Sequence, residues 1–160
     1  MAVRKIAKTL DDEAALRKLC RPVTEFGESL HALIDDLKET IGFGTTGSGI
    51  AAPQVFVPWR VCVVYYGEEC IEMVNPKIIN YSENTTPFIE GCLSVVDVKG
   101  RCIEQEIERP KWVRIEFADR LGNVQVKKIS GYVARIVCHE IDHLDATLIT
   151  DRAGKERGGY

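Results

Sequence analysis

The chain has 160 residues, of which 45% are hydrophobic and 28% charged, the composition of a globular protein with a substantial core. Its net charge is −3 and the two signs are interspersed, which excludes a nucleic-acid surface built on a basic run. No apolar stretch is long enough to span a membrane and no secretory or transit signal opens the chain, so we expect one domain over residues 1–160, in the cytoplasm.

The first strong pattern along the chain is an amphipathic helix over residues 25–41. Its apolar residues recur at helical spacing, and Thr24 stands where an N-cap is expected. The glycine-rich loop "GFGTTGSG" at 42–49 ends this helix. The Lys and Ser/Thr of a phosphate-binding P-loop do not follow it, so we do not expect that role for the loop.

The middle of the chain predicts strands. The segments rich in β-branched and aromatic residues are 60–66, 70–76, 77–83, 101–108, 112–118 and 123–129. Tight turns between neighbours indicate antiparallel pairing. A last helix is expected over 130–144, with Ser130 as its cap. The sum predicts an α+β fold: antiparallel sheets packed around a C-terminal metal-binding helix, with helices in the N-terminal part.

That last helix carries "HEIDH" at 139–143. Residues four apart share a helix face, so His139 and His143 can hold one metal ion, and Glu140 is the natural general base. Catalytic sites of this type want a third protein ligand and an open fourth position. Zinc proteases with this motif take their third ligand from further along the chain, and this chain does not offer one there. Position 149, where a histidine would be needed, is Ile149, and the only later glutamate is Glu156, in a short tail.

The third ligand must therefore come from upstream. His31 is one candidate, but a lone histidine in an amphipathic helix is more often a surface or half-buried residue. Cys92, in "EGCLS" between strand-like segments, is the better candidate, since a site of two histidines and one cysteine is chemically sound. Such a site suits zinc or Fe(II) better than magnesium or calcium, and iron, zinc, nickel and cobalt remain open. We expect most of the other cysteines to be buried and all to be reduced, because none forms C-x-x-C: they are Cys20, Cys62, Cys70, Cys102 and Cys138.

Three motifs in order, "GSGIAAPQ" (47–54), "EGCLS" (90–94) and "CHEIDHLDA" (138–146), resemble those of peptide deformylases. The resemblance spans roughly residues 4–152. It implies hydrolysis of the N-formyl group from the methionine that starts nascent chains. It further implies Cys92 as the third ligand, and Gln54 and the backbone N–H of Leu93 as donors to the reacting carbonyl oxygen. It favours Fe(II) in the cell, with zinc, nickel or cobalt in purified protein, and formyl-methionyl nascent peptides as partners.

The same helix predicts part of a substrate pocket. Residues three, four and seven positions before His139 share its face, so Ile136 and Tyr132 are expected to wall a pocket for the methionine side chain, with Arg135 turned to a carboxylate. Gly49 would let the opposite loop approach the substrate backbone. Ser48 replaces an aliphatic residue usual in the resembling family, which predicts a weaker preference for methionine. The alternative to this pocket role is that Ile136 and Tyr132 make ordinary contacts in the hydrophobic core.

Other expectations concern the surroundings. Glu90 is expected to be an ion-pair partner beside the site, and Asp142 either orients a ligand imidazole or is an exposed helix carboxylate. The stretch between Ser94 and Arg109 is several residues longer than usual in the resembling family, and the tail after Arg152 is short, so at most a transient ribosome contact is expected. The competing functions are a deformylase-like enzyme with another acyl or side-chain specificity and a weakly active binder of N-blocked peptides.

Overall fold

The computed structural model describes residues 1–154, so Glu156 and the rest of the tail lie outside the described residues. Four α-helices are present in this part of the chain: α1 Thr9–Leu16, α2 Glu28–Thr40, α3 Gly131–Leu144 and α4 Ile149–Arg152. Two 3-10 turns cover Gly42–Gly44 and Ala52–Val55. The strands are β1 Gly49–Ala51, β2 Val61–Tyr66, β3 Glu69–Tyr81, β4 Thr85–Val96, β5 Cys102–Pro110, β6 Trp112–Ala118 and β7 Val124–Ser130. None of the described helices is long and apolar enough to cross a membrane.

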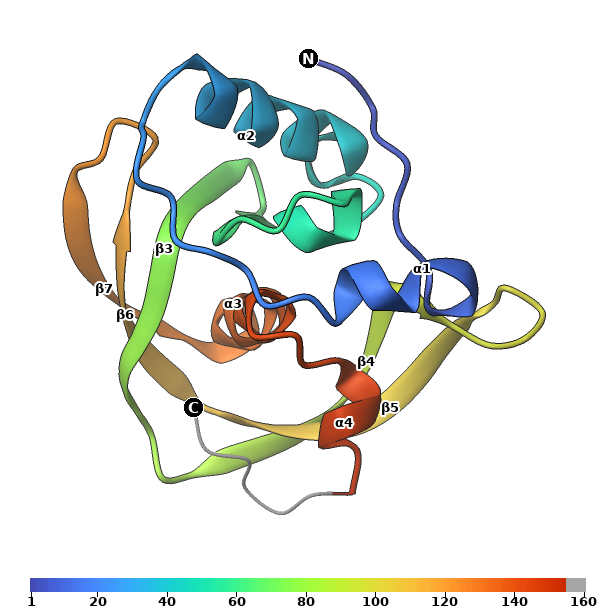
Figure 1. Ribbon diagram of the computed structural model, residues 1–160. Coiled ribbons are helices and arrows are strands. Elements are labelled where there is room, and N and C mark those ends of the chain that lie inside the picture. The colour runs from blue at the N-terminus through green and yellow to red at the C-terminus, as the bar shows by residue number, and fades with distance from the viewer. Residues whose placement is uncertain (155–160) are drawn as a thin grey trace.

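The strands form two antiparallel sheets. One has five strands in the order β1-β2-β3-β6-β7, and the other is the β4–β5 hairpin. Figure 1 shows α3 end-on near the middle, with the five-stranded sheet on one side, the hairpin on another and α2 at the edge. The α+β fold with antiparallel sheets around the C-terminal helix is confirmed.

Helix α3 is central, and ten of its fourteen residues are buried. Its apolar side chains join those of β2, β3 and β6 in one core cluster, which includes Val137, Ile141, Cys62 and Ile115. Ser130 occupies the N-cap position as predicted, but its side chain makes no capping hydrogen bond. Helix position is therefore set by burial of the apolar residues more than by the cap.

Two predicted boundaries were wrong. The N-cap of α2 is Gly27 and not Thr24. Residues 22–26 before it are not helical, and both backbone groups of Val23 hydrogen-bond to the side chain of Asn75. The two strands predicted over 70–76 and 77–83 form one strand, β3, which continues through a bulge near Asn75, whose φ is 52°.

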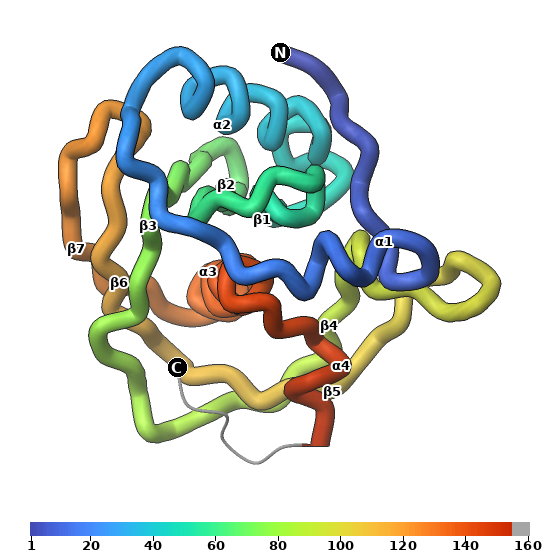
Figure 2. The backbone as a smooth tube through the Cα atoms, viewed as in Figure 1, coloured from blue at the N-terminus to red at the C-terminus, as the bar shows by residue number. Residues whose placement is uncertain are grey.

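Strand β4 was missed, and this matters for the site. Cys92 lies inside β4 and not between strands as the sequence suggested. The first half of β4 is mostly exposed and contains Pro87, and Gly91 follows it, so this part of the strand lacks the apolar alternation by which half-buried strands are recognised. The backbone path in Figure 2 brings this strand close to α1 and to α4. All six cysteines are free, as expected.

Candidate metal centre

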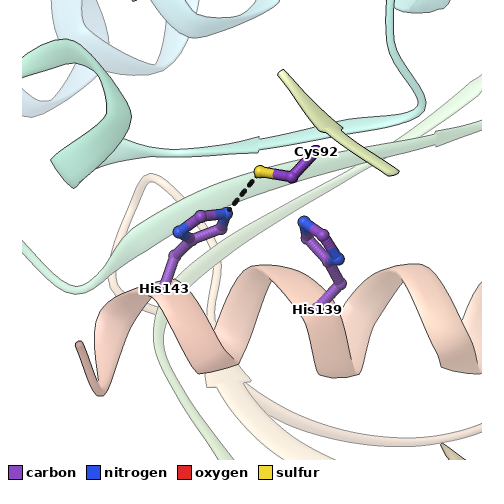
Figure 3. Close-up of side chains that lie close together, drawn as sticks. All are labelled: Cys92, His139 and His143. Atoms are coloured by element: carbon purple, nitrogen blue, oxygen red, sulfur yellow. Dashed lines mark hydrogen bonds between the residues drawn. The ribbon is translucent and has the colours of Figure 1, made fainter. Parts of the chain in front are cut away.

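Two elements bring three potential metal-ligating side chains together. His139 and His143 lie one turn apart on α3, and Cys92 faces them from β4 (Figure 3). One ligand atom from each residue can be chosen so that all lie within 4.8 Å of one another. The other candidate, His31, is elsewhere: its Nε2 pairs with the carbonyl oxygen of Arg120, 2.9 Å away.

The donor set fits a tetrahedral metal ion. The Sγ of Cys92 lies 3.3 Å from Nε2 of His143. Two ligands of one zinc-like ion, at about 2.3 Å for sulfur and 2.0–2.1 Å for nitrogen, stand roughly 3.5 Å apart at a tetrahedral angle. Burial by itself would raise the pKa of the Cys92 thiol, but the His143 charge and hydrogen bonds from both histidines hold that pKa well below its ordinary value. The sulfur is thus prepared to be a thiolate, the form that binds metals.

Glu90 orients one of the two imidazoles. The Nδ1 of His139 lies 3.1 Å from Oε2 of Glu90, so an N–H there donates to the carboxylate and leaves Nε2 as the free lone pair. Arg109 makes hydrogen bonds of 2.9 Å to both Glu90 oxygens, and Arg135 makes one of 2.7 Å. Despite the burial of Glu90, the bonds from Arg109 and His139 hold its pKa well below the ordinary value. The expected ion-pair role of Glu90 is confirmed.

Asp142 fits neither of the two roles expected from the sequence, a partner of a ligand imidazole or an exposed helix carboxylate. It is only 4% exposed, and within residues 1–154 its carboxylate pairs with arginines and not with a histidine. It accepts hydrogen bonds from Arg109 at 2.6 Å and from Arg152. Arg109 on β5 therefore ties β4, through Glu90, to α3, through Asp142. Sequence reasoning missed this arginine as a member of the site.

Glu140 is buried beside the ligands. Its side chain is 3% exposed, and its Oε2 atom has no hydrogen-bond partner among the described residues. Burial raises the pKa of the carboxyl to about 7. Gly49 packs directly against it: a Cβ added at Gly49 would stand 2.6 Å from Oε1 of Glu140. Position 49 therefore needs glycine because of this contact as well as any contact with a ligand.

Gln54 is held by its neighbours in a defined orientation. Its Oε1 accepts a hydrogen bond of 2.9 Å from the backbone N–H of Ala51. Its Nε2 then points into the site, 3.0 Å from the hydroxyl of Ser94 and 3.9 Å from Sγ of Cys92. Leu93 follows Cys92 on β4 and is half-buried. An amide N–H of Gln54 and the Leu93 backbone therefore both border the metal-binding side chains.

A cleft with a volume of about 330 Å³ opens onto this cluster. The predicted site residues that line it are Ser48, Gly49, Gln54, Cys92, Leu93, Tyr132, Ile136, His139 and Glu140. His143 lies behind them and is 1% exposed. The ring of Tyr132 stands edge-on to Phe88 with the centroids 5.9 Å apart. The guanidinium of Arg135 is occupied by Glu90 and backbone carbonyls, as its expected turn toward a carboxylate requires.

Comparison with known proteins gives a consistent result. The family model described as polypeptide deformylase matches residues 3–158. A peptide deformylase of Caldicellulosiruptor bescii is 45% identical over 95% of this chain and 86% of its own. The crystal structure of peptide deformylase from Thermotoga maritima matches with a TM-score of 0.87 at 34% identity, covering 97% of this chain and all of that one. A Met-Ala-Ser-bound class I type b peptide deformylase from Acinetobacter baumannii matches with a TM-score of 0.85 at 31% identity, over 95% of this chain and 100% of its own.

Proposed function

Since this chain belongs to the peptide deformylase family, we propose that Cys92, His139 and His143 hold the divalent metal ion on which its reaction depends. The protein is a metal-dependent hydrolase that removes the formyl group from the N-terminus of nascent peptides. The observation that carries the residue assignment is the meeting of these ligand atoms, within 4.8 Å, at a cleft that also contains the buried Glu140.

The chemistry divides between the metal and Glu140. The ion, when bound, acts as a Lewis acid toward water and the formyl carbonyl. We assign to Glu140 the transfer of protons: its carboxylate takes one from the attacking water and returns it to the leaving amine. Its unpartnered Oε2 and its position between the ligand histidines support this role.

The negative charge that develops on the formyl oxygen during the reaction needs hydrogen-bond donors to stabilise it. We assign these to the amide of Gln54 and the backbone N–H of Leu93. The Oε1 of Gln54 is fixed by Ala51, so the Nε2 that faces the site is oriented before substrate arrives. Removal of one such donor typically costs ~3–4 kcal/mol of transition-state stabilisation.

The substrate peptide is assigned to the cleft. Gly49 and Ser48 border one side of it, and Tyr132 and Ile136 the other. Ile136 is 8% exposed, which suits the wall of a pocket for a methionine side chain, whereas Tyr132 is 60% exposed and belongs to the mouth. A related enzyme binds Met-Ala-Ser, and we propose formyl-Met-Ala-Ser as a substrate for this one.

Formyl-Met-Ala-Ser and acetyl-Met-Ala-Ser separate the candidate functions. We expect this chain, purified without oxygen, to release formate from the first and to leave the second intact, because the reaction of its family removes a formyl group. Comparable hydrolysis of both would indicate a broader metalloamidase. Binding of both without hydrolysis would indicate a binder of N-blocked peptides.

We propose Fe(II) as the ion in the cell, with zinc, nickel or cobalt able to replace it. A mixed sulfur and imidazole donor set suits these metals better than magnesium or calcium. A cysteine thiolate at a metal site that borders an open cleft is exposed to oxidants, and Fe(II) promotes the damage. The iron form should therefore lose activity in air while the nickel form keeps it, as measured by formate release at intervals. Equal decay of the two forms would contradict iron-promoted oxidation.

Ser48→Ile should sharpen side-chain preference. Ser48 is exposed and lines the cleft, so an aliphatic side chain there would add apolar contact for methionine. One such contact is worth about 1–3 kcal/mol, which corresponds to roughly 10-fold or more in the ratio of kcat/KM for formyl-Met over formyl-Ala peptides. Thr46→Ile is the matched control on the same loop, since Thr46 is exposed but lies outside the cleft. An unchanged ratio in Ser48→Ile would remove Ser48 from the pocket.

We further propose that residues 1–160 act as one catalytic domain in the cytoplasm and that any ribosome contact is transient. A net charge of −3 gives no general attraction to ribosomal RNA. The protein should stay in the supernatant when ribosomes are pelleted through sucrose. Stoichiometric pelleting with ribosomes at physiological salt would contradict a transient contact.

A further inference from the structure

Lys8 makes a contact that the reaction described above does not use. This residue precedes α1, and its Nζ donates a hydrogen bond of 2.5 Å to the backbone carbonyl oxygen of Leu93 on β4, 85 residues away in the sequence. The contact is partly buried, and within residues 1–154 no carboxylate forms an ion pair with this ammonium group. The positive charge of Lys8 therefore contacts the peptide group between Leu93 and Ser94, directly after the candidate ligand Cys92.

The neighbours of Lys8 fix it there. The backbone N–H of Ala7 donates to the carbonyl of Gln54 at 2.7 Å. The hydroxyl of Thr9 donates to the carbonyl of Val96 at 3.1 Å and accepts from the N–H of Val96 at 3.0 Å. The N-terminal segment therefore joins the Gln54 turn to β4, and Figure 2 shows it running down to α1 beside that strand.

The peptide that Lys8 contacts leads directly to the sulfur. The carbonyl of Leu93 and the N–H of Ser94 belong to the same peptide plane, and that N–H donates to Sγ of Cys92 at 3.4 Å. A cation bound to a peptide oxygen polarises the whole plane and strengthens the N–H at its other end as a donor. The N–H of Leu93, assigned above to the formyl oxygen, belongs to the preceding peptide and is not part of this path.

We propose that Lys8 is a positioning residue for the metal thiolate: through the Leu93–Ser94 peptide it strengthens the hydrogen bond to Sγ of Cys92 and so withdraws electron density from the sulfur. This inference rests on the assignment of Cys92 as a ligand. A thiolate that donates less charge leaves its metal a stronger Lewis acid. Hydrogen-bond partners of metal ligands typically change affinity or activity by about 10- to 100-fold.

The thiolate-to-metal charge-transfer band of the Co(II)-loaded protein reports on the sulfur directly. Lys8→Met removes the charge and keeps a chain of similar length. Its sulfur lone pairs should rise in energy, so the band should move to longer wavelength, and kcat should fall about 10-fold with KM less affected. Lys8→Arg keeps the positive charge and a donor, and should restore both the band position and the turnover.

Two control variants separate this effect from simpler ones. Lys5→Met removes the same charge three residues earlier, where Nζ pairs with Asp12. Thr9→Val loosens the attachment of the same segment to β4 without removing charge. We expect both to leave the band in place, even where Thr9→Val lowers the melting temperature.

Each outcome has a definite reading. A band that moves in Lys8→Met alone and returns in Lys8→Arg supports the proposal. An unmoved band in Lys8→Met, or an equal movement in Lys5→Met or Thr9→Val, overturns it. Absence of the band from the unmodified protein would instead overturn the assignment of Cys92. If Lys8→Met fails to fold, Lys8→Gln takes its place. It also removes the charge but keeps a neutral donor, and the position of the same charge-transfer band is measured and interpreted in the same way.

Discussion

Cys92→Ala should lose its metal and its activity together. The substitution removes the only sulfur among the three candidate ligands and leaves two imidazoles on one helix, which is short of the three protein ligands that catalytic zinc-type sites keep. We expect less than about a tenth of the metal content of the unmodified protein after dialysis and no formate release above background. Metal analysis by mass spectrometry and a formate assay on the same sample measure the two together.

Cys138→Ala is the matched control for this loss. Cys138 directly precedes His139, but it points into the core with no exposed surface, and burial raises the pKa of its thiol to about 12. It therefore stays a neutral thiol, and its replacement should cost roughly 1 kcal/mol of stability without loss of metal. If Cys92→Ala kept stoichiometric metal and turnover, or if Cys138→Ala lost them, the ligand set proposed here would be wrong.

The three candidate ligands were selected from the sequence for different reasons. His139 and His143 follow from the helical period, which the apolar residues of α3 make unambiguous. Cys92 was selected for its chemistry and its motif, while its local structure was predicted incorrectly. Its strand was missed because the first half of β4 is largely exposed beside the cleft and so carries little of the burial pattern that reveals a strand.

The interactions that hold the ligands in place left no local trace in the sequence. Arg109 reads as a polar residue between two predicted strands, yet it is 1% exposed and contacts Glu90, 19 residues earlier, and Asp142, 33 residues later. From the sequence, Asp142 is either a partner of a ligand imidazole or an exposed helix carboxylate, and neither interpretation includes an arginine. Ion pairs of this kind depend on how the hairpin packs on α3, which propensity and periodicity do not encode.

Gly49 shows a similar limit. In the sequence it belongs to a glycine-rich loop, where chain turning is a sufficient explanation. In the structure it is the residue against which the Glu140 carboxylate packs. The need for glycine therefore arises from a side chain 91 positions later, and this link provides an independent way to test the role of Glu140.

Glu140→Gln should retain metal and lose turnover by at least ~10²-fold, the usual range for general acid–base catalysis. The amide has the same shape as the carboxylate but cannot take a proton from water. Removal of a buried carboxylate whose Oε2 has no partner among the described residues should also leave the metal-free protein at least as stable, because burial of that charge is unfavourable. Metal content, formate release and melting temperature, measured on one preparation, distinguish a lost base from a damaged site.

Gly49→Ala tests the same carboxylate without changing it. The new Cβ would lie 2.6 Å from Oε1 and 2.9 Å from Cγ of Glu140, so the whole Glu140 side chain should shift to another rotamer while the metal ligands stay in place. We expect full metal content and turnover reduced in the same direction as in Glu140→Gln. Combining the two substitutions should then cost little more than Glu140→Gln alone, since both act on one proton transfer. Near-normal turnover in Glu140→Gln would show that another group moves the proton, and losses that multiply in the double variant would show that Gly49 acts separately from Glu140.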